Sequence, residues 1–212
     1  MSDYQLFLAS TTNGRKITVL VELLNIQSKV EIITIDLAKK QQKEDWFLKI
    51  NPNGKIPALA SKDSSNPFYL SESNAILQFL VSKYDTENKF SYPVNSNNYF
   101  KTLELSLFQV SALAPVQGKI FGVIRNLLHL SESDVNDLYT EIKRVYQVLE
   151  DILKSNNTGF LVGDKLTIAE VFVLPWIEKA AFSKIDLTQF PLLNDLLKRS
   201  LQVPEIAKGL AY

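Results

Sequence analysis

The sequence predicts an α/β domain followed by an all-helical domain. Over residues 1–84, apolar runs of strand length alternate with segments whose apolar residues recur at helical spacing. Residues 85–96 carry few core-type residues and several Asn and Ser, which is typical of a linker. From residue 97 to residue 212 the pattern is helical throughout. We therefore expect an α/β plus all-α fold, with domains at 1–84 and 97–212 joined by the linker.

The first domain should open with a strand, a helix and a second strand. Tyr4 to Ala9 is an apolar run of strand length, and the polar residues Ser10 to Gly14 end it. A helix is predicted next, because apolar residues recur at helical spacing at Ile17, Leu20, Val21 and Leu24. Residues 30–36 are rich in β-branched residues, and this second strand should return parallel to the first in a right-handed βαβ unit.

The rest of the first domain should contain a short helix, a hairpin and a closing helix. The short helix is predicted over residues 45–50, and the two hairpin strands over 56–60 and 68–70. The apolar face of the closing helix comprises Ile76, Leu77, Leu80 and Val81. The resulting order, βαβ followed by αββα, is the thioredoxin-like arrangement.

Helices alone are expected in the second domain. A first helix should end or kink at Pro115, and a second segment follows over residues 116–128. Ser131 to Asp134 is typical of a helix cap, and the long helix that it opens should stop at residues 156–159. Further on, Thr167 and Glu170 have the spacing of a capping box. We expect this box to start a core helix and to carry no chemistry.

Composition and charge exclude several classes of function. With 46% hydrophobic and 22% charged residues and a formal net charge of zero, the chain has the composition of a globular protein. It has no basic stripe, which argues against nucleic acid and anionic membranes as partners. No apolar run reaches membrane-spanning length, and the first residues lack the features of a signal peptide. We expect a soluble, cytoplasmic protein.

The chain has no Cys and a single His, His129. A protein thiol nucleophile, a redox Cys-x-x-Cys motif and a zinc finger are therefore excluded, and no metal site is expected. Any thiol chemistry must use a thiol that a ligand brings.

Two stretches, Asn51 to Leu59 and Ser71 to Leu77, are the candidates for a binding site. The first has an Asn-Gly turn before Ile56-Pro57, and a cis peptide there would direct the backbone of Ile56 towards a groove. The second begins a helix, and the free N–H groups of its first turn favour a carboxylate near Ser73. Each stretch alone is as typical of an ordinary turn or helix cap. Together they indicate a receptor for a small peptide-like anion.

The order and spacing of these stretches resemble the glutathione-binding signature of the glutathione transferase superfamily. The segment from Gly163 to Glu170 is similar to the folding motif of the helical domain in the same superfamily, so the resemblance covers both halves of the chain. Residues 11–17, 141–146 and 161–176 are most similar to fungal transferases related to the prion-forming nitrogen-catabolite regulator, and to the bacterial nu class. The chain lacks the long Asn/Gln-rich head of that regulator, which favours an enzyme.

The resemblance implies that glutathione is the co-substrate and that its thiol is activated by the loop after the first strand. Asn13, supported by Thr11, is the expected donor to the thiolate, although Ser10 and Thr12 are close enough to take this role. The alternative for Asn13-Gly14 is a helix N-cap. No general base is required, because hydrogen bonds and a helix dipole can lower the pKa of a thiol.

The resemblance also assigns residues to the rest of glutathione. Ile56, before Pro57, should pair with the cysteinyl backbone, and Glu72 and Ser73 should hold the γ-glutamyl group. Gln42 and Lys55 are candidates for the glycyl carboxylate, with a solvated side chain as the alternative. The second substrate is expected near Phe108, Phe121 and Ile124, with a core role as the alternative.

One position departs from the family pattern. Asp137 stands where the nu class and its fungal relatives carry an Arg that helps to bind a second glutathione for disulfide reduction, although Lys119 or Arg125 could substitute. Two hypotheses follow. The first is a transferase that conjugates small electrophiles or reduces peroxides or disulfides; the second is a non-catalytic interaction or regulatory module of the same fold. The resemblance implies a homodimer in either case.

Overall fold

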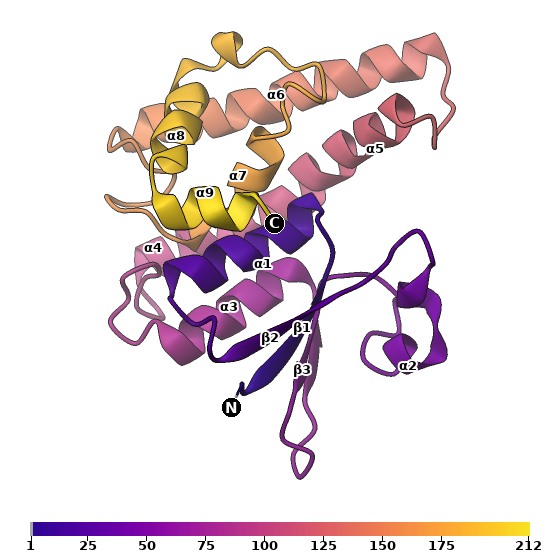
Figure 1. Cartoon of the computed structure of the whole chain (residues 1–212). Helices are drawn as coiled ribbons and strands as arrows, with labels where there is room; N and C mark the ends of the chain where they lie inside the picture. The colour runs from indigo at the N-terminus through magenta and orange to yellow at the C-terminus, as the bar shows by residue number, and fades with distance from the viewer. Residues whose placement is uncertain (1) are drawn as a thin grey trace. The chain divides into compact units, whose positions relative to one another are not determined.

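The computed structural model describes residues 2–212, which divide into two compact units (Figure 1). One unit runs to Ser91 and also includes Val203–Tyr212, and the other is Tyr92–Gln202. The last ten residues, which the sequence suggested for a helical domain at 97–212, thus group with the first unit. The predicted fold class, a thioredoxin-like region followed by a helical one, is confirmed.

In the described part of the chain, four strands form one sheet in the order β2-β1-β3-β4. The bounds are β1 Tyr4–Leu8, β2 Val30–Thr34, β3 Ala58–Ser61 and β4 Tyr69–Ser71. Strand β2 is parallel to β1, whereas the β1–β3 and β3–β4 pairs are antiparallel. This is the predicted βαβ unit followed by a hairpin.

Helices cover both faces of this sheet. Figure 1 shows α1 (Thr12–Leu23) and α3 (Ser73–Tyr84) on one side, and α2 (Asp45–Leu48) on the other. A 3₁₀ turn, η1 (Gln41–Lys43), precedes α2.

Helix α9 (Pro204–Leu210) packs against α1, which explains why the end of the chain belongs to the first unit. Gly209 allows this approach, because a Cβ there would collide with the backbone of Val19. The Thr18 hydroxyl also donates a hydrogen bond to the carbonyl oxygen of Gly209 at 2.7 Å.

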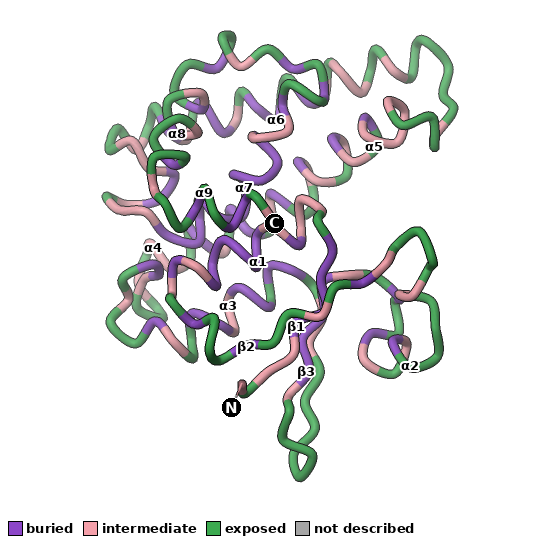
Figure 2. The backbone as a smooth tube through the Cα atoms, in the orientation of Figure 1, coloured by how far each residue is buried: buried purple, intermediate pink, exposed green. Residues whose placement is uncertain are grey.

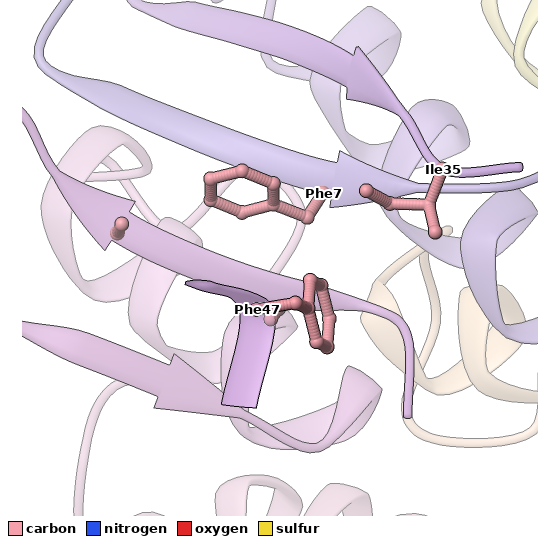
Figure 3. Close-up of a cluster of buried hydrophobic side chains, with 5 residues drawn as sticks. Phe7, Ile35 and Phe47 are labelled. Carbon is pink, nitrogen blue, oxygen red and sulfur yellow. The ribbon is translucent and has the colours of Figure 1, made fainter. Parts of the chain in front are cut away.

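A cluster of buried side chains fills the face of the sheet that α2 covers (Figure 3). It consists of Phe7, Ile35, Phe47, Ala58 and Ala60. The rings of Phe7 and Phe47 meet edge to face, with their centroids 6.0 Å apart. The side chain of Ile56 packs against this cluster, which therefore supports the turn before β3.

In the second unit, one continuous helical run joins α4 (Asn97–Phe108), a π-helical turn η2 (Gln109–Leu113) and α5 (Ala114–Ile124). Pro115 does not end this helix; it lies just after the π turn, where the regular i→i+4 pattern is already interrupted. By length and composition Asn97–Ile124 could cross a membrane, with a mean hydropathy of 1.4 in an 18-residue window. The expectation that no apolar run reaches this length was wrong, and only 22% of that window is buried inside the described structure.

The remaining helices of the second unit are α6 (Glu132–Asn156), α7 (Ile168–Ile177), the 3₁₀ turn η3 (Leu187–Gln189) and α8 (Pro191–Leu201). Helix α7 is buried along its whole length (Figure 2). The predicted capping box is present at its start, since the Thr167 side chain accepts from the backbone and Glu170 accepts from Thr167 N–H at 2.8 Å. Glu170 also accepts from Leu161 N–H at 2.8 Å, and burial raises its pKa to about 7.

Candidate functional site

The register of the sheet brings the three predicted binding segments to the same end of the strands. Phe7, near the end of β1, pairs with Ala58 at the start of β3, and Ala58 pairs with Ser71 at the end of β4. The loop after β1, the turn before β3 and the segment after β4 therefore leave the sheet at the same end. Asn13, Ile56 and Glu72 follow or precede these strand ends by a few residues.

The loop after β1 runs directly into α1, and Thr11 is the N-cap of that helix. The Oγ1 atom of Thr11 accepts a hydrogen bond from Gly14 N–H at 3.1 Å. Gly14 is required here, because a Cβ would collide with the carbonyl oxygen of Ala9. Asn13 lies inside the first turn, so the alternative role of helix N-cap belongs to Thr11.

Asn13 is the group of this loop with unused hydrogen-bonding capacity. Its Oδ1 atom is buried, and no group within residues 2–212 pairs with it. The N–H groups of Thr12 and Asn13 also make no hydrogen bond to any described part of the chain. A buried polar atom without a partner is uncommon in a native fold, which suits a position that contacts a ligand. The amide can turn so that its N–H groups, and not the oxygen, face that ligand.

Ser10 has a different environment. Its hydroxyl donates to the carbonyl oxygen of Tyr212 at 2.5 Å and accepts from Nη2 of Arg15 at 3.3 Å. These two bonds occupy the Ser10 hydroxyl, so of the four loop candidates it is the least suited to donate to a thiolate.

The turn before β3 is built around the buried side chain of Asn51. Its Nδ2 donates to the carbonyl oxygen of Lys55 at 2.7 Å, and its Oδ1 accepts from Asn53 N–H at 3.1 Å. Gly54 has a φ of 60°, and a Cβ there would press on the carbonyl oxygen of Gln42. This role of Asn51 was not predicted from the sequence, although an Asn side chain often hydrogen-bonds to the backbone two residues further on in a turn.

The Ile56-Pro57 peptide bond is cis. Within the part of the chain that the structure describes, neither the N–H nor the C=O of Ile56 has a hydrogen-bond partner. An unpaired backbone edge of this kind can bind an extended peptide by main-chain hydrogen bonds.

Gln42 and Lys55 lie on either side of this turn. Gln42 is on η1, and its buried Oε1 atom has no partner among the described residues. Lys55 is exposed. The unpartnered amide of Gln42 suits a ligand contact better than the solvated side chain that was its alternative role.

Glu72 and Ser73 stand at the start of α3. Glu72 is the N-cap, and its φ of 70° is uncommon for a residue with a Cβ. Its side chain makes no capping bond and is exposed, whereas Ser73 is buried. Such a backbone conformation costs on the order of 1–3 kcal/mol and is typical of functional sites.

Lys16 is a residue of this site that the sequence analysis missed. It comes from α1, has no exposed surface, and donates from Nζ to Asn74 Oδ1 at 3.0 Å and to Ser73 Oγ at 3.3 Å. Burial lowers the pKa of Lys16 to about 7, against the opposing effect of the nearby Glu72 charge. Its spacing from Leu20 was the available signal, because residues four apart lie on the same face of a helix.

The residues suggested for the second substrate all lie in the second unit. Phe121 is half-buried and stacks on Trp176, with ring centroids 5.8 Å apart and an interplanar angle of 2°. Arg125 lies 5.8 Å from the Phe121 ring, whereas Asp137 is exposed on α6. Phe108 and Ile124 are half-buried, and Lys119 is also on α5. Their role in substrate binding stays a prediction.

Comparison with known proteins identifies similar chains over nearly the whole length. Residues 12–83 match the model of the glutathione S-transferase N-terminal domain, and residues 131–211 match that of the C-terminal domain. Glutathione S-transferase 2 of Schizosaccharomyces pombe is 37% identical over 172 residues, which cover 79% of this chain and 71% of that protein. The disulfide-bond oxidoreductase YfcG of Escherichia coli is 30% identical over 208 residues, covering 97% and 93%.

A solved structure gives the same result. A glutathione transferase homolog from Lodderomyces elongisporus, crystallised with two glutathione molecules per subunit, superposes with a TM-score of 0.93. It is 37% identical, and the match covers 100% of this chain and 99% of that one. Among residues 2–212 no group of three or more His, Cys, Asp or Glu side chains could hold a metal ion.

Proposed function

This chain belongs to the glutathione S-transferase family, and we propose that it binds glutathione and activates the thiol for attack on a small electrophile. The observation that supports this most is the single sheet edge that gathers Asn13, the unpaired backbone of Ile56 and the Glu72–Ser73 pair. The three features supply a donor for a thiolate, a backbone partner for a peptide and a site for an amino-acid group. Glutathione has the three matching groups: a thiol, a peptide backbone and a free amino-acid end.

In this proposal each end of glutathione has its own partners. The N–H and C=O of Ile56 pair with the cysteinyl backbone, next to Pro57. Glu72 receives the γ-glutamyl ammonium, and Ser73 with the first turn of α3 receives the α-carboxylate. Gln42 and Lys55 take the glycyl carboxylate; the unpartnered Oε1 of Gln42 marks an amide that can turn its N–H groups to a ligand.

The thiol is activated by hydrogen bonds to its charged form. The Asn13 amide, the Thr11 hydroxyl and the first-turn N–H groups of α1 stabilise the thiolate, and the positive end of the helix dipole adds to this effect. A hydrogen bond to a charged group contributes about 1.5–3 kcal/mol, and each pKa unit corresponds to about 1.4 kcal/mol. One such bond is therefore enough to lower the thiol pKa by about a unit.

Disulfide reduction is a second candidate activity, because two similar proteins point to it. One is named a disulfide-bond oxidoreductase, and the other holds two glutathione molecules per subunit. Asp137 is exposed, and the resemblance places it where the nu class and its fungal relatives carry an Arg, which argues for conjugation instead. The proposal further includes a soluble, cytoplasmic homodimer that acts on an electrophile, a peroxide or a disulfide.

A calorimetric titration with reduced glutathione tests the proposal. Saturable binding of one glutathione per subunit supports conjugation, and two per subunit support disulfide reduction. Turnover of a chlorodinitrobenzene electrophile and of a glutathione mixed disulfide should then be compared in the same preparation. Binding without turnover of either compound would favour the non-catalytic module, and no binding at millimolar glutathione would refute the proposed function.

A further inference from the structure

We propose that Lys16 is a positioning residue that makes the start of α3 selective for the α-carboxylate of the γ-glutamyl group. This inference rests on the proposed function and concerns a residue to which that function assigned no role. Lys16 lies on α1, and its amine reaches Ser73 and Asn74 on α3.

The hydrogen bonds of this group set the direction of the Ser73 hydroxyl. Lys16 Nζ donates to Ser73 Oγ, so the Ser73 oxygen acts as an acceptor towards α1. The Ser73 hydroxyl donates to Asn74 Oδ1, and the Oγ–Oδ1 distance of 3.4 Å is long for a hydroxyl hydrogen bond. A ligand carboxylate, which accepts hydrogen bonds and donates none, can therefore replace this weak Asn74 bond and take the Ser73 proton.

Two opposite charges of the protein, on Lys16 and Glu72, lie near the start of α3 and can orient the two charged groups of an amino-acid zwitterion. The Lys16 amine adds positive charge below Ser73 and the first turn of α3, where a carboxylate is already favoured. Glu72, one residue earlier, provides a negative charge for the ammonium. The site then binds the zwitterion in one orientation, with its carboxylate towards Ser73 and its ammonium towards Glu72.

A purely structural role explains the buried amine of Lys16 less well than a role in ligand binding does. The buried face of α1 is otherwise largely apolar, with Ile17, Val19 and Leu20 fully buried. A Met at position 16 would fill similar space without the cost of burying an amine. The amine lies directly beneath the two residues proposed to bind the γ-glutamyl group.

Two probes test the inference: S-methylglutathione, which has no ionisable thiol, and its analogue in which γ-aminobutyrate replaces γ-glutamate and removes the α-carboxylate. At about pH 6, where the Lys16 amine still carries its proton, binding of S-methylglutathione should weaken roughly tenfold in Lys16→Met, while binding of the analogue changes by less than about twofold. KM for glutathione should rise and kcat should stay nearly constant. Lys29→Met, an exposed lysine before β2, is the matched control and should bind both probes normally.

Equal weakening of both probes would indicate a structural role and overturn the inference, as would unchanged binding of S-methylglutathione. Lys16→Gln keeps a donor for Ser73 without the charge, and it should lose the same selectivity if Lys16→Met folds poorly. The unaltered protein provides a third test. Its preference for the probe with the carboxylate should fall between about pH 6 and about pH 8.5, as the amine loses its proton in the field of Glu72. If the unaltered protein binds neither probe, the proposed function itself fails.

Discussion

Replacing Lys16 with Met should stabilise the fold most at neutral pH and progressively less as the pH rises. Burial lowers the pKa of Lys16 from 10.5 to about 7, so between these values the unfolded chain holds a proton that the folded chain has lost. Above the unfolded pKa of 10.5 the amine is neutral in both states, so burying it carries no cost from titration. As the pH falls towards 7 this cost grows, and the free energy of unfolding of the unaltered protein falls with it. Met has no proton to lose, so the variant does not show this dependence.

The size of the effect follows from the same two pKa values. They differ by about 3.5 pH units, which corresponds to about 5 kcal/mol between the two ends of the range. The slope is about 1.4 kcal/mol for each pH unit. Part of the gain at neutral pH is offset, because Met removes the two hydrogen bonds from Lys16 to Ser73 and Asn74, each worth about 0.5–1.5 kcal/mol.

Urea unfolding of both proteins at about pH 7, 8 and 9 measures this dependence. The difference between Lys16→Met and the unaltered protein should shrink by about 1.4 kcal/mol for each pH unit. Lys29→Met, whose lysine is exposed, should show no such trend. A difference that stays constant across this range would mean that the Lys16 amine keeps its proton in the fold, and the reasoning from burial would be refuted.

Variants at three further positions test other parts of the structure. Asn13→Ala should lower kcat at least about tenfold with little change in glutathione affinity, whereas Asn66→Ala at the opposite end of the β3–β4 hairpin should not; equal activity would move the donor role to Thr11. Glu72→Ala and Glu72→Gly should both weaken glutathione binding sharply, but Gly should be more stable than Ala by about 1 kcal/mol because it accepts the φ of 70°. Thr167→Ala should cost about 1 kcal/mol in thermal or urea unfolding and leave glutathione affinity unchanged, which would separate the capping box from the site.

The order of the elements could be predicted because each one carries its own local signal. Alternating strand and helix patterns gave the βαβ and hairpin order, and the capping box at Thr167 marked the start of α7. The continuous run through Pro115 could not be predicted in this way. A proline normally ends a helix, and the π turn that precedes it has no distinct sequence signal.

The packing of α9 also lay beyond the local pattern. Helical spacing predicts that Val203–Tyr212 is helical but does not identify the helix that it contacts. That information is in Gly209, whose missing side chain lets α9 approach Val19 of α1 closely. A glycine inside a short helix is the sequence feature to examine for such a contact.

The candidate site was predictable where it depends on turns and helix starts. Ile56, Glu72 and Asn13 follow signals of this kind, and the sheet register brings their segments to one edge. Lys16 was missed because a lysine is normally exposed, and its burial depends on α3, more than fifty residues later in the chain. Contacts between distant segments of this kind are not encoded in any single stretch.

Two unfavourable features meet where α1 reaches the start of α3. Glu72 has a backbone conformation that a residue with a Cβ rarely adopts, and Lys16 buries an amine that donates to the neutral side chains of Ser73 and Asn74. Other packing also supports the first unit, namely the cluster around Phe47 and the contact of α9 with α1. An uncommon backbone conformation and a buried charged group that lie close together are typical of a binding site. The start of α3 is therefore where the proposed ligand, more than stability, would account for the residues present.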